Sequence, residues 1–321
     1  MIISKTPLRI SFAGGGTDIS DFYNYEPGAV ISAAINKYIY IILNHRFQKG
    51  YRFCYSKVEE INGLNEIEHP LFRECLKSIP VPSCDISSLA DIPKATGLGS
   101  SSSFTVGLLN VLAASRSKYL EKGLLAEEAC KIEIERLKEH IGKQDQYCAI
   151  FGGLNLIEFE PDKVTVKPIL CDLSTKDELN QSLMLISTGI KREGSAGDII
   201  DTYNFKQKMD ILKEMKGIAY EMKDILEEGK MIGDFGTLLD ESWKLKKKIS
   251  RKISNNEVDK IYNLGIEAGA IGAKICGAGD GGFILFFVEK QKKDKVRQAL
   301  WPLQEIPFRF DPEGSRIVYV D

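Results

Sequence analysis

The chain has 321 residues, which is the length of about two ordinary domains. Hydrophobic residues make up 43% of it and charged residues 27%, a balance that excludes a mainly disordered chain and supplies a large core. Lys and Arg number 43 against 45 Asp and Glu, so the net charge is -2 and the chain has no overall basic field to hold nucleic acid or an anionic membrane.

Strand and helix patterns alternate along the first half of the chain. Runs rich in Ile, Val and Tyr predict strands, and apolar residues at helical spacing predict helices. The expected elements are strands at 2–12, 29–43, 51–55, 83–92, 154–159 and 164–169, and helices at 70–78, 104–115 and 126–138.

The second half is richer in helical patterns. The expected elements are strands at 183–187, 273–276, 283–288 and 316–320, and helices within 199–252 and at 256–269 and 290–303. Mixed groups of strands and helices predict an α+β fold of two lobes. A polar run between Ile169 and Leu183 separates the two groups, so we expect an N-terminal lobe over residues 1–175 and a C-terminal lobe over residues 176–321.

Cysteine and histidine usage indicates neither disulfides nor zinc. The seven cysteines form no C-x-x-C pair and the three histidines no H-E-x-x-H motif, so packed, reduced thiols are expected. Residues 1–10 contain no signal-peptide core, and Asn36 and Lys37 interrupt the longest apolar stretch, 29–43. These features predict a cytoplasmic protein that does not span a membrane.

Glycine-rich loops carry the strongest functional signal. The first, residues 9–18 (RISFAGGGTD), lets a ligand approach the backbone closely, and Asp18 offers an acceptor for hydroxyl groups; a plain glycine turn explains it equally well. The second, residues 93–103 (PKATGLGSSSS), opens a helix, where free N–H groups favour a phosphate and serine hydroxyls can ligate a cation. It is not the phosphate-binding motif G-x-x-x-x-G-K-[ST].

The third loop, residues 277–282 (GAGDGG), matches the dinucleotide-binding pattern G-x-G-x-x-G. That pattern requires a helix to follow, whereas residues 283–288 (FILFFV) predict a strand, so an oxidoreductase is disfavoured. A fourth segment, residues 141–146 (IGKQDQ), holds Asp145, which taken alone is an ordinary surface acid.

These four segments, in this order, resemble the GHMP kinases, a superfamily of small-molecule kinases, over nearly the whole chain. The chain is most similar to the bacterial D-glycero-D-manno-heptose 7-phosphate kinases, on residues 9–18, 97–103, 142–147 and 187–189. The resemblance implies an N-terminal lobe like ribosomal protein S5 domain 2, a C-terminal ferredoxin-like lobe, and ATP with Mg²⁺ as cofactors. It also implies phosphorylation of the anomeric C1 hydroxyl of the heptose 7-phosphate to the 1,7-bisphosphate.

The same resemblance implies roles for single residues. Asp145 is the expected catalytic base, and Arg9 beside it would keep the carboxylate ionised. The Mg²⁺ ligands would be Ser101 and Glu133, with Glu135 left open as the rival acid because the spacing varies in the superfamily. The expected ATP-binding residues are Gly97, Leu98, Gly99, Ser100, Ser101 and Ser102.

The sugar site rests on a comparison with galactokinases, which have a Glu and a His where Gly15 and Gly16 stand here. Two glycines open space for a bulkier heptose phosphate. Lys143 is the first candidate for binding the sugar's phosphate, and Lys191 and Arg192 are alternatives. The expected sugar-binding residues are Gly14, Gly15, Gly16, Thr17, Asp18, Lys143, Thr188, Arg192, Gly277 and Gly279.

Two further features qualify this interpretation. Asp280 stands in the third loop where the family commonly has Gly; Asp tolerates a positive φ, but its charge could weaken nucleotide binding. The lysine run 244–252 is expected to form a solvated helix face. The alternatives are a kinase for another sugar, of the fucose or galactose type, and a non-catalytic sugar- or nucleotide-binding relative.

Overall fold

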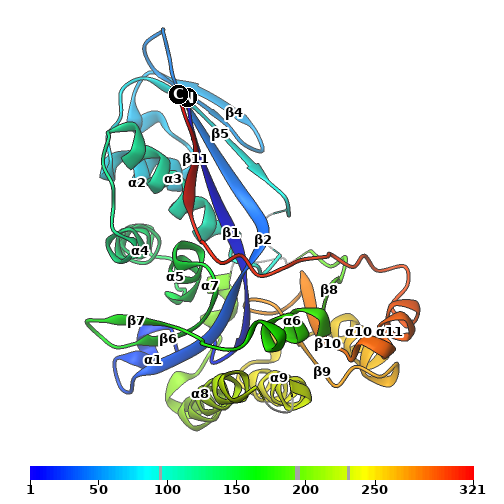
Figure 1. The fold of residues 1–321 in the computed structure, drawn as a ribbon. Coiled ribbons are helices and arrows are strands. Elements are labelled where there is room, and N and C mark those ends of the chain that lie inside the picture. The colour runs from blue at the N-terminus through cyan, green and yellow to red at the C-terminus, as the bar shows by residue number, and fades with distance from the viewer. Residues whose placement is uncertain (94–95, 192–195, 230–231) are drawn as a thin grey trace.

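The structure, a computed structural model, describes residues 1–93, 96–191, 196–229 and 232–321. Its upper part is a sheet with helices on one face, and its lower part is richer in helices (Figure 1). This arrangement confirms the α+β prediction from the sequence.

Two long antiparallel strands connect the two parts. β1 (Ile2–Ala13) and β2 (Gly28–His45) pair along nearly the whole length of β1. One half of β2 pairs with β5 (Cys84–Ala90) and the other with β6 (Leu154–Phe159). The pair therefore runs from the upper part into the lower part (Figure 1).

The large sheet has the order β11-β1-β2-β5-β3-β4, with β6 and β7 attached along β2. β3 pairs with β5 in parallel, and the other pairs are antiparallel. Its remaining strands are β3 (Tyr51–Cys54), β4 (Val58–Ile61), β7 (Val164–Pro168) and β11 (Arg316–Val320).

The last strand returns to the start of the chain. β11 pairs with β1, the Asp321 N–H donates to the Met1 carbonyl at 3.0 Å, and the two termini lie side by side (Figure 1). The division between residues 175 and 176 stays a prediction, but β11, which lies beyond it in the chain, belongs to the sheet of the N-terminal part.

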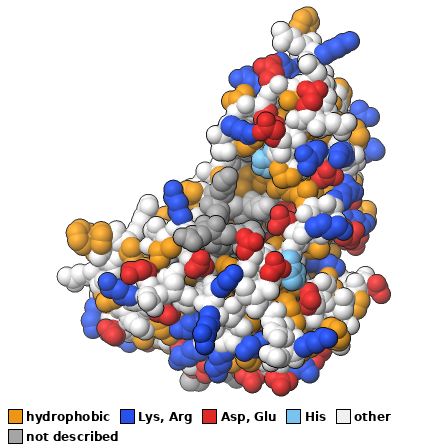
Figure 2. Space-filling view, turned by 180° about the vertical axis from the view of Figure 1, so that it is seen from behind, with side chains coloured by type: hydrophobic (Ala, Val, Ile, Leu, Met, Phe, Trp, Pro, Cys, Tyr) orange, Lys and Arg blue, Asp and Glu red, His pale blue; other side chains and the backbone are white. Residues whose placement is uncertain are grey.

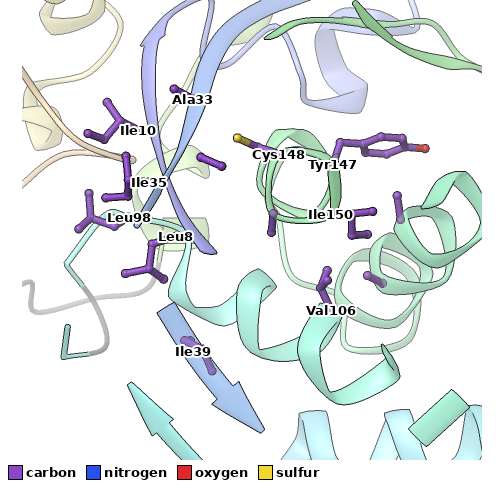
Figure 3. Packing of buried hydrophobic residues seen from close by; sticks show 14 of the residues in the cluster. Leu8, Ile10, Ala33, Ile35, Ile39, Leu98, Val106, Tyr147, Cys148 and Ile150 are labelled. Atoms are coloured by element: carbon purple, nitrogen blue, oxygen red, sulfur yellow. The ribbon is translucent and has the colours of Figure 1, made fainter. Parts of the chain in front are cut away.

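Helices cover the inner face of this sheet. α3 is buried along most of its length because it packs between β1–β2 and the neighbouring helices. Figure 3 shows Leu8 and Ile10 of β1, Val106 of α3 and Ile150 of α5 within this core. The elements are α1 (Ser20–Tyr23), η1 (Leu64–Glu66), α2 (Pro70–Ser78), α3 (Ser100–Ser115), α4 (Lys122–Cys130), the π-helix η2 (Lys131–Arg136) and α5 (Gln144–Phe151).

The lower part holds a second antiparallel sheet of order β8-β10-β9. Its central strand is entirely buried, which explains the unbroken apolar run at 283–287. The elements are α6 (Leu173–Ser182), β8 (Leu183–Ser187), α7 (Ala196–Ile200), α8 (Phe205–Glu228), α9 (Ile232–Lys247), η3 (Arg251–Ile253), α10 (Asn256–Glu267), β9 (Gly272–Ile275), β10 (Phe283–Phe287), η4 (Lys290–Lys292) and α11 (Lys293–Ala299).

Several sequence predictions can now be compared with the structure. The third glycine loop joins two strands, β9 and β10, as predicted. The helix predicted at 104–115 begins four residues earlier, at Ser100, and the helix predicted at 126–138 begins at Lys122 and continues as a π-helix. All seven cysteines are free thiols. Within the described ranges, every helix is too short or too polar to cross a bilayer.

Candidate active site

The three glycine loops and the 141–146 segment converge on one cavity of about 720 Å³. The space-filling view shows this hollow between the upper and lower parts, with hydrophobic side chains gathered in it (Figure 2). We call the part of the cavity around the paired Arg9 and Asp145 the polar end, and the part around the neighbouring rings of Tyr55, His69 and Phe104 the apolar end. Such a cavity suits a ligand with a flat apolar group and a charged tail.

Arg9 and Asp145 form the central ion pair of the polar end. Arg9 Nε donates to Asp145 Oδ1 at 2.6 Å, and a terminal guanidinium nitrogen donates to Oδ2 at 2.7 Å. Arg9 is 4% exposed, and its second terminal nitrogen donates to the Gly97 carbonyl at 2.6 Å. β1 and the start of α5 thus bring the two predicted catalytic residues together in a bidentate pair, the strongest form of such contacts.

The second loop places the N-terminus of α3 at the cavity. Gly97, Gly99, Ser100, Ser101 and Ser102 line it. Leu98 does not: its side chain is fully buried, and its carbonyl accepts the Arg9 N–H at 3.0 Å. Since the first N–H groups of a helix have no partner inside it, this end of α3 is suited to an anion.

The third loop packs directly against the second. A Cβ at Gly277 would lie 2.6 Å from Gly97 Cα, so this approach requires glycine. Asp280 adopts the positive φ that the sequence analysis allowed, at 65°. Its side chain accepts a hydrogen bond from Asn255 at 3.1 Å and is not part of the cavity lining.

Glu133 is the buried acid of the cavity. It lies in the π-helix, a feature frequent at functional sites, and accepts hydrogen bonds from Ser102 (2.7 Å), Thr105 and Gln146. Burial raises the pKa of Glu133 to about 7, against the effect of these hydrogen bonds. Its rival Glu135 is exposed and does not line the cavity.

The serine closest to this acid differs from the expected metal ligand. Ser102 donates to Glu133, whereas Ser101 is exposed and lines the cavity. The two predicted Mg²⁺ ligands, Ser101 and Glu133, therefore both line the cavity, and no hydrogen bond joins them in the described part of the chain. Carboxylate and hydroxyl oxygens are the ligands that Mg²⁺ prefers, and Glu133 and Ser101 fit that donor chemistry.

Asp18 is a second buried acid that lines the cavity. Its Oδ1 accepts the Gly16 N–H at 2.9 Å, and its Oδ2 accepts the Gln144 N–H at 3.3 Å. Burial raises the pKa of Asp18 despite these hydrogen bonds. A Cβ at Gly142 would lie 1.8 Å from Asp18 Oδ2, so the catalytic segment approaches Asp18 through a glycine.

The remaining predicted sugar residues divide into two groups. Gly15, Gly16 and Gly277 line the cavity; Gly14, Thr17, Lys143, Thr188 and Gly279 do not, and Arg192 lies outside the described residues. Several of the second group stabilise the loops. Thr17 Oγ1 donates to the Gly14 carbonyl at 2.8 Å, and Thr188 Oγ1 donates to the Gly282 carbonyl at 2.9 Å. The Lys143 ammonium lies 4.7 Å from the centre of the Tyr23 ring.

Two buried lysines of the cavity were missed by the sequence reasoning. Lys246 of α9 is 5% exposed and donates to the Gly277 carbonyl, so the prediction of a solvated face over 244–252 is wrong at this position. Lys274 of β9 is 3% exposed and donates to the Ser11 carbonyl at 2.7 Å. The signal that could have identified Lys274 is that it stands between apolar residues within a predicted strand.

The apolar end was also not predicted. Tyr55, His69 and Phe104 form an aromatic group there, with ring centroids of His69 4.8 Å from Tyr55 and 5.4 Å from Phe104. They come from the end of β3, the start of α2 and α3. Because these positions are far apart in the chain, no local motif shows them.

Comparisons with known proteins agree with this geometry. Residues 67–153 match the family model "GHMP kinases N terminal domain", and residues 222–303 match "GHMP kinases C terminal". The chain is 34% identical to the D-glycero-alpha-D-manno-heptose 7-phosphate kinase of Campylobacter jejuni, with 98% of each chain covered.

Solved structures share the fold over the full length. A D-glycero-D-manno-heptose 1-phosphate kinase from Bacteroides thetaiotaomicron superposes with a TM-score of 0.84, 27% identity and complete coverage of both chains. Methanococcus jannaschii mevalonate kinase superposes with a TM-score of 0.76 at 23% identity, covering 96% of this chain and 98% of that one, which shows the fold alone.

The family models and the relatives named as kinases show that the molecule is a phosphotransferase whose acceptor is a hydroxyl group, and the cavity with its glycine loops and its Arg9–Asp145 pair agrees with that class. The chain belongs to the GHMP kinases. The family and the fold class predicted from the sequence are thereby confirmed.

Proposed function

We propose that this chain is an ATP-dependent kinase that phosphorylates the anomeric C1 hydroxyl of D-glycero-D-manno-heptose 7-phosphate, giving the 1,7-bisphosphate. The Arg9–Asp145 pair carries the proposal, because the Asp145 carboxylate that Arg9 holds lies against Gly99 of the second loop, in the same cavity as Asp18. The 34% identity to a heptose 7-phosphate kinase over 98% of the chain supports the choice of sugar.

ATP would span the cavity from its apolar to its polar end. The purine ring would lie among Tyr55, His69 and Phe104, and the triphosphate would lie along the second loop and the start of α3. The direct contact between Gly97 and Gly277 supports this placement, since both loops then face the phosphates.

Ser101 and Glu133 would hold Mg²⁺ at the phosphate end. When bound, this ion would neutralise charge on the β- and γ-phosphates. The hydroxyls of Ser102 and Thr105 and the Gln146 amide orient the Glu133 carboxylate, which therefore keeps one position in the cavity wall.

Asp145 would accept the proton of the C1 hydroxyl. The hydroxyl oxygen then attacks the γ-phosphorus, the bond from that phosphorus to the bridging oxygen breaks, and ADP leaves. A carboxylate has about four acceptor positions and Arg9 occupies two of them, so Asp145 retains capacity for the proton. Arg9 also places positive charge beside the transferring group.

The sugar would lie against Asp18, Gly15 and Gly16. A Cβ at Gly15 would lie 3.6 Å from Gln144 Nε2 and 3.8 Å from Ser11 Oγ, so a side chain there would occupy the space that the sugar needs. Lys143, Lys191 and Arg192 remain the candidates for the 7-phosphate. Galactose or fucose as the acceptor is the alternative within the same class.

The test is coupled ADP release with a panel of acceptors: D-glycero-D-manno-heptose 7-phosphate, the heptose 1-phosphate, unphosphorylated heptose, galactose and fucose. We expect kcat/KM for the 7-phosphate to exceed the others by at least about tenfold, the effect of one charge-assisted contact. An equal or higher kcat/KM for galactose or the 1-phosphate would refute the proposed substrate.

A further inference from the structure

Polar atoms with no partner gather at the Asp18 end of the cavity. Ser11 Oγ and Gln144 Oε1 are both buried and have no hydrogen-bond partner in the described part of the chain. Both side chains are close to Gly15, where a Cβ would lie 3.8 Å from Ser11 Oγ and 3.6 Å from Gln144 Nε2, and all three residues line the cavity. Buried polar atoms normally have partners, so these two are suited to a polar ligand.

Lys274 adds a buried charge to the same place. Its side chain reaches from β9 to β1, where it donates one hydrogen bond to the Ser11 carbonyl at 2.7 Å. An ammonium group has three protons, and among the described residues Lys274 forms no ion pair and no second hydrogen bond. Two donors therefore remain for a ligand in the cavity.

The position of Lys274 indicates that it would bind the acceptor and not the nucleotide. Its one hydrogen bond is to the first loop, and Asp18 is the carboxylate whose charge acts on it. The nucleotide side has its own cation, Lys246, on the Gly277 carbonyl of the third loop.

We propose that Lys274, together with Ser11 and Gln144, binds sugar oxygens next to the reacting hydroxyl and determines specificity for the acceptor. The proposal rests on the proposed function as a sugar kinase. It assigns to the sugar three residues that the sequence analysis did not single out: Lys274, which lies outside the four segments, and Ser11 and Gln144, which lie within residues 9–18 and 141–146.

A purely structural role is the competing explanation, in which Lys274 only connects β9 to the Ser11 carbonyl of β1. The two roles differ in what they affect. If Lys274 only connects the two strands, its loss should lower the free energy of unfolding and change the KM values of both substrates alike. If Lys274 binds the sugar, its loss should change the KM for the sugar alone. Burial lowers the pKa of Lys274 to about 8, because the charged ammonium is poorly solvated there. Oxygen atoms of a bound sugar would stabilise the protonated form.

The experiment compares Lys274→Met and Lys274→Arg with the control Lys293→Met. Lys293 of α11 also donates from its ammonium to a backbone carbonyl, that of Leu183 at 2.8 Å, but it does not line the cavity. We expect Lys274→Met to raise KM for the sugar by about 10–100-fold, since hydrogen bonds from charged groups are the strong ones. The KM for ATP should stay within about twofold, Lys274→Arg should recover most of the sugar affinity, and Lys293→Met should change neither KM.

A second variant covers the case in which Lys274→Met does not fold. Ser11→Ala removes a hydroxyl that has no partner in the described protein, so thermal unfolding should be unchanged while KM for the sugar rises several-fold. An unaltered sugar KM in Ser11→Ala, or a folded Lys274→Met enzyme in which kcat falls while the sugar KM stays parental, would overturn the proposal.

The measurements use whichever sugar the parent enzyme phosphorylates in the panel. A parent that phosphorylates no sugar refutes the proposed function. A parent that is active on a sugar, with a KM insensitive to Lys274 and Ser11, refutes only the assignment of these residues.

Discussion

The contact between Gly142 and Asp18 provides a sharp test of the sugar site. Replacing Gly142 by Ala places a Cβ 1.8 Å from Asp18 Oδ2 and 2.3 Å from Cγ. Carbon atoms in contact are normally about 3.5–4 Å apart, so the carboxylate must move by more than about 1 Å. It is held by the N–H groups of Gly16 and Gln144, and such a movement breaks at least one of these hydrogen bonds.

The expected change in KM follows from the displacement of the Asp18 carboxylate, a charged group. Hydrogen bonds to a charged group are worth about 1.5–3 kcal/mol, so loss of the Asp18 contact should raise KM for the sugar by about 10–100-fold. The ATP site is formed by other loops, and KM for ATP should stay within about twofold. Crowding of this kind should also lower the free energy of unfolding by about 1–3 kcal/mol.

The assay is coupled ADP release with each substrate varied in turn, together with urea unfolding. Gly123→Ala is the matched control, because a Cβ at Gly123 in α4 meets nothing within 4 Å. It should leave both KM values unchanged and stabilise the helix by up to about 1 kcal/mol. A folded Gly142→Ala enzyme with the parental sugar KM would refute the placement of Asp18 in the sugar site.

Three further predictions concern the transfer site and pH. Asp145→Asn should lower kcat by about 10²–10⁴-fold while ATP binding, measured by nucleotide titration, is retained; a kcat within a few-fold of the parent would remove Asp145 from the role of base. Ser101→Ala and Glu133→Gln should each raise the Mg²⁺ concentration for half-maximal rate, whereas Glu135→Gln should not; the reverse result for the two acids would exchange their roles. Lys274 loses its proton as pH rises through about 8, where burial has placed its pKa, among the charges of Arg9 and Asp18 and the Cys276 thiol. The parental sugar affinity should therefore fall above that pH and the affinity of Lys274→Arg should not, as measured from kcat/KM profiles; the same alkaline fall in both enzymes would exclude Lys274 as its cause.

The sequence was most informative where chemistry lies in a short contiguous segment. Glycine- and serine-rich loops indicate close backbone approach and helix N-termini by composition alone, and Gly97, Ser101 and Asp18, which the sequence pointed to, line one cavity. The strand after the third loop was equally clear, because 283–288 is too apolar for an exposed helix.

The sequence could not predict contacts that depend on how a helix is rotated about its axis, or on packing between segments far apart in the chain. Ser101 and Ser102 are one residue apart, and only the start of α3 at Ser100 decides that Ser102 turns to Glu133. Lys246 is one of several lysines at 244–252, and its burial follows from the packing of α9 against the third loop.

The helix α5 was missed for a related reason. The segment Gln144–Phe151 is eight residues long, too short to show helical periodicity, and its conformation depends on packing against α3 and β1. Yet this helix carries Asp145 to Arg9, so the tertiary structure rather than local propensity assembles the transfer site.

The central claim is the position of the transferred phosphate. Phosphorus NMR of the product from D-glycero-D-manno-heptose 7-phosphate and ATP measures it directly. The account predicts one new phosphorus resonance coupled to the anomeric proton, with the resonance of the 7-phosphate retained. A new phosphate on any other carbon, or no sugar product while galactose is converted, would contradict it.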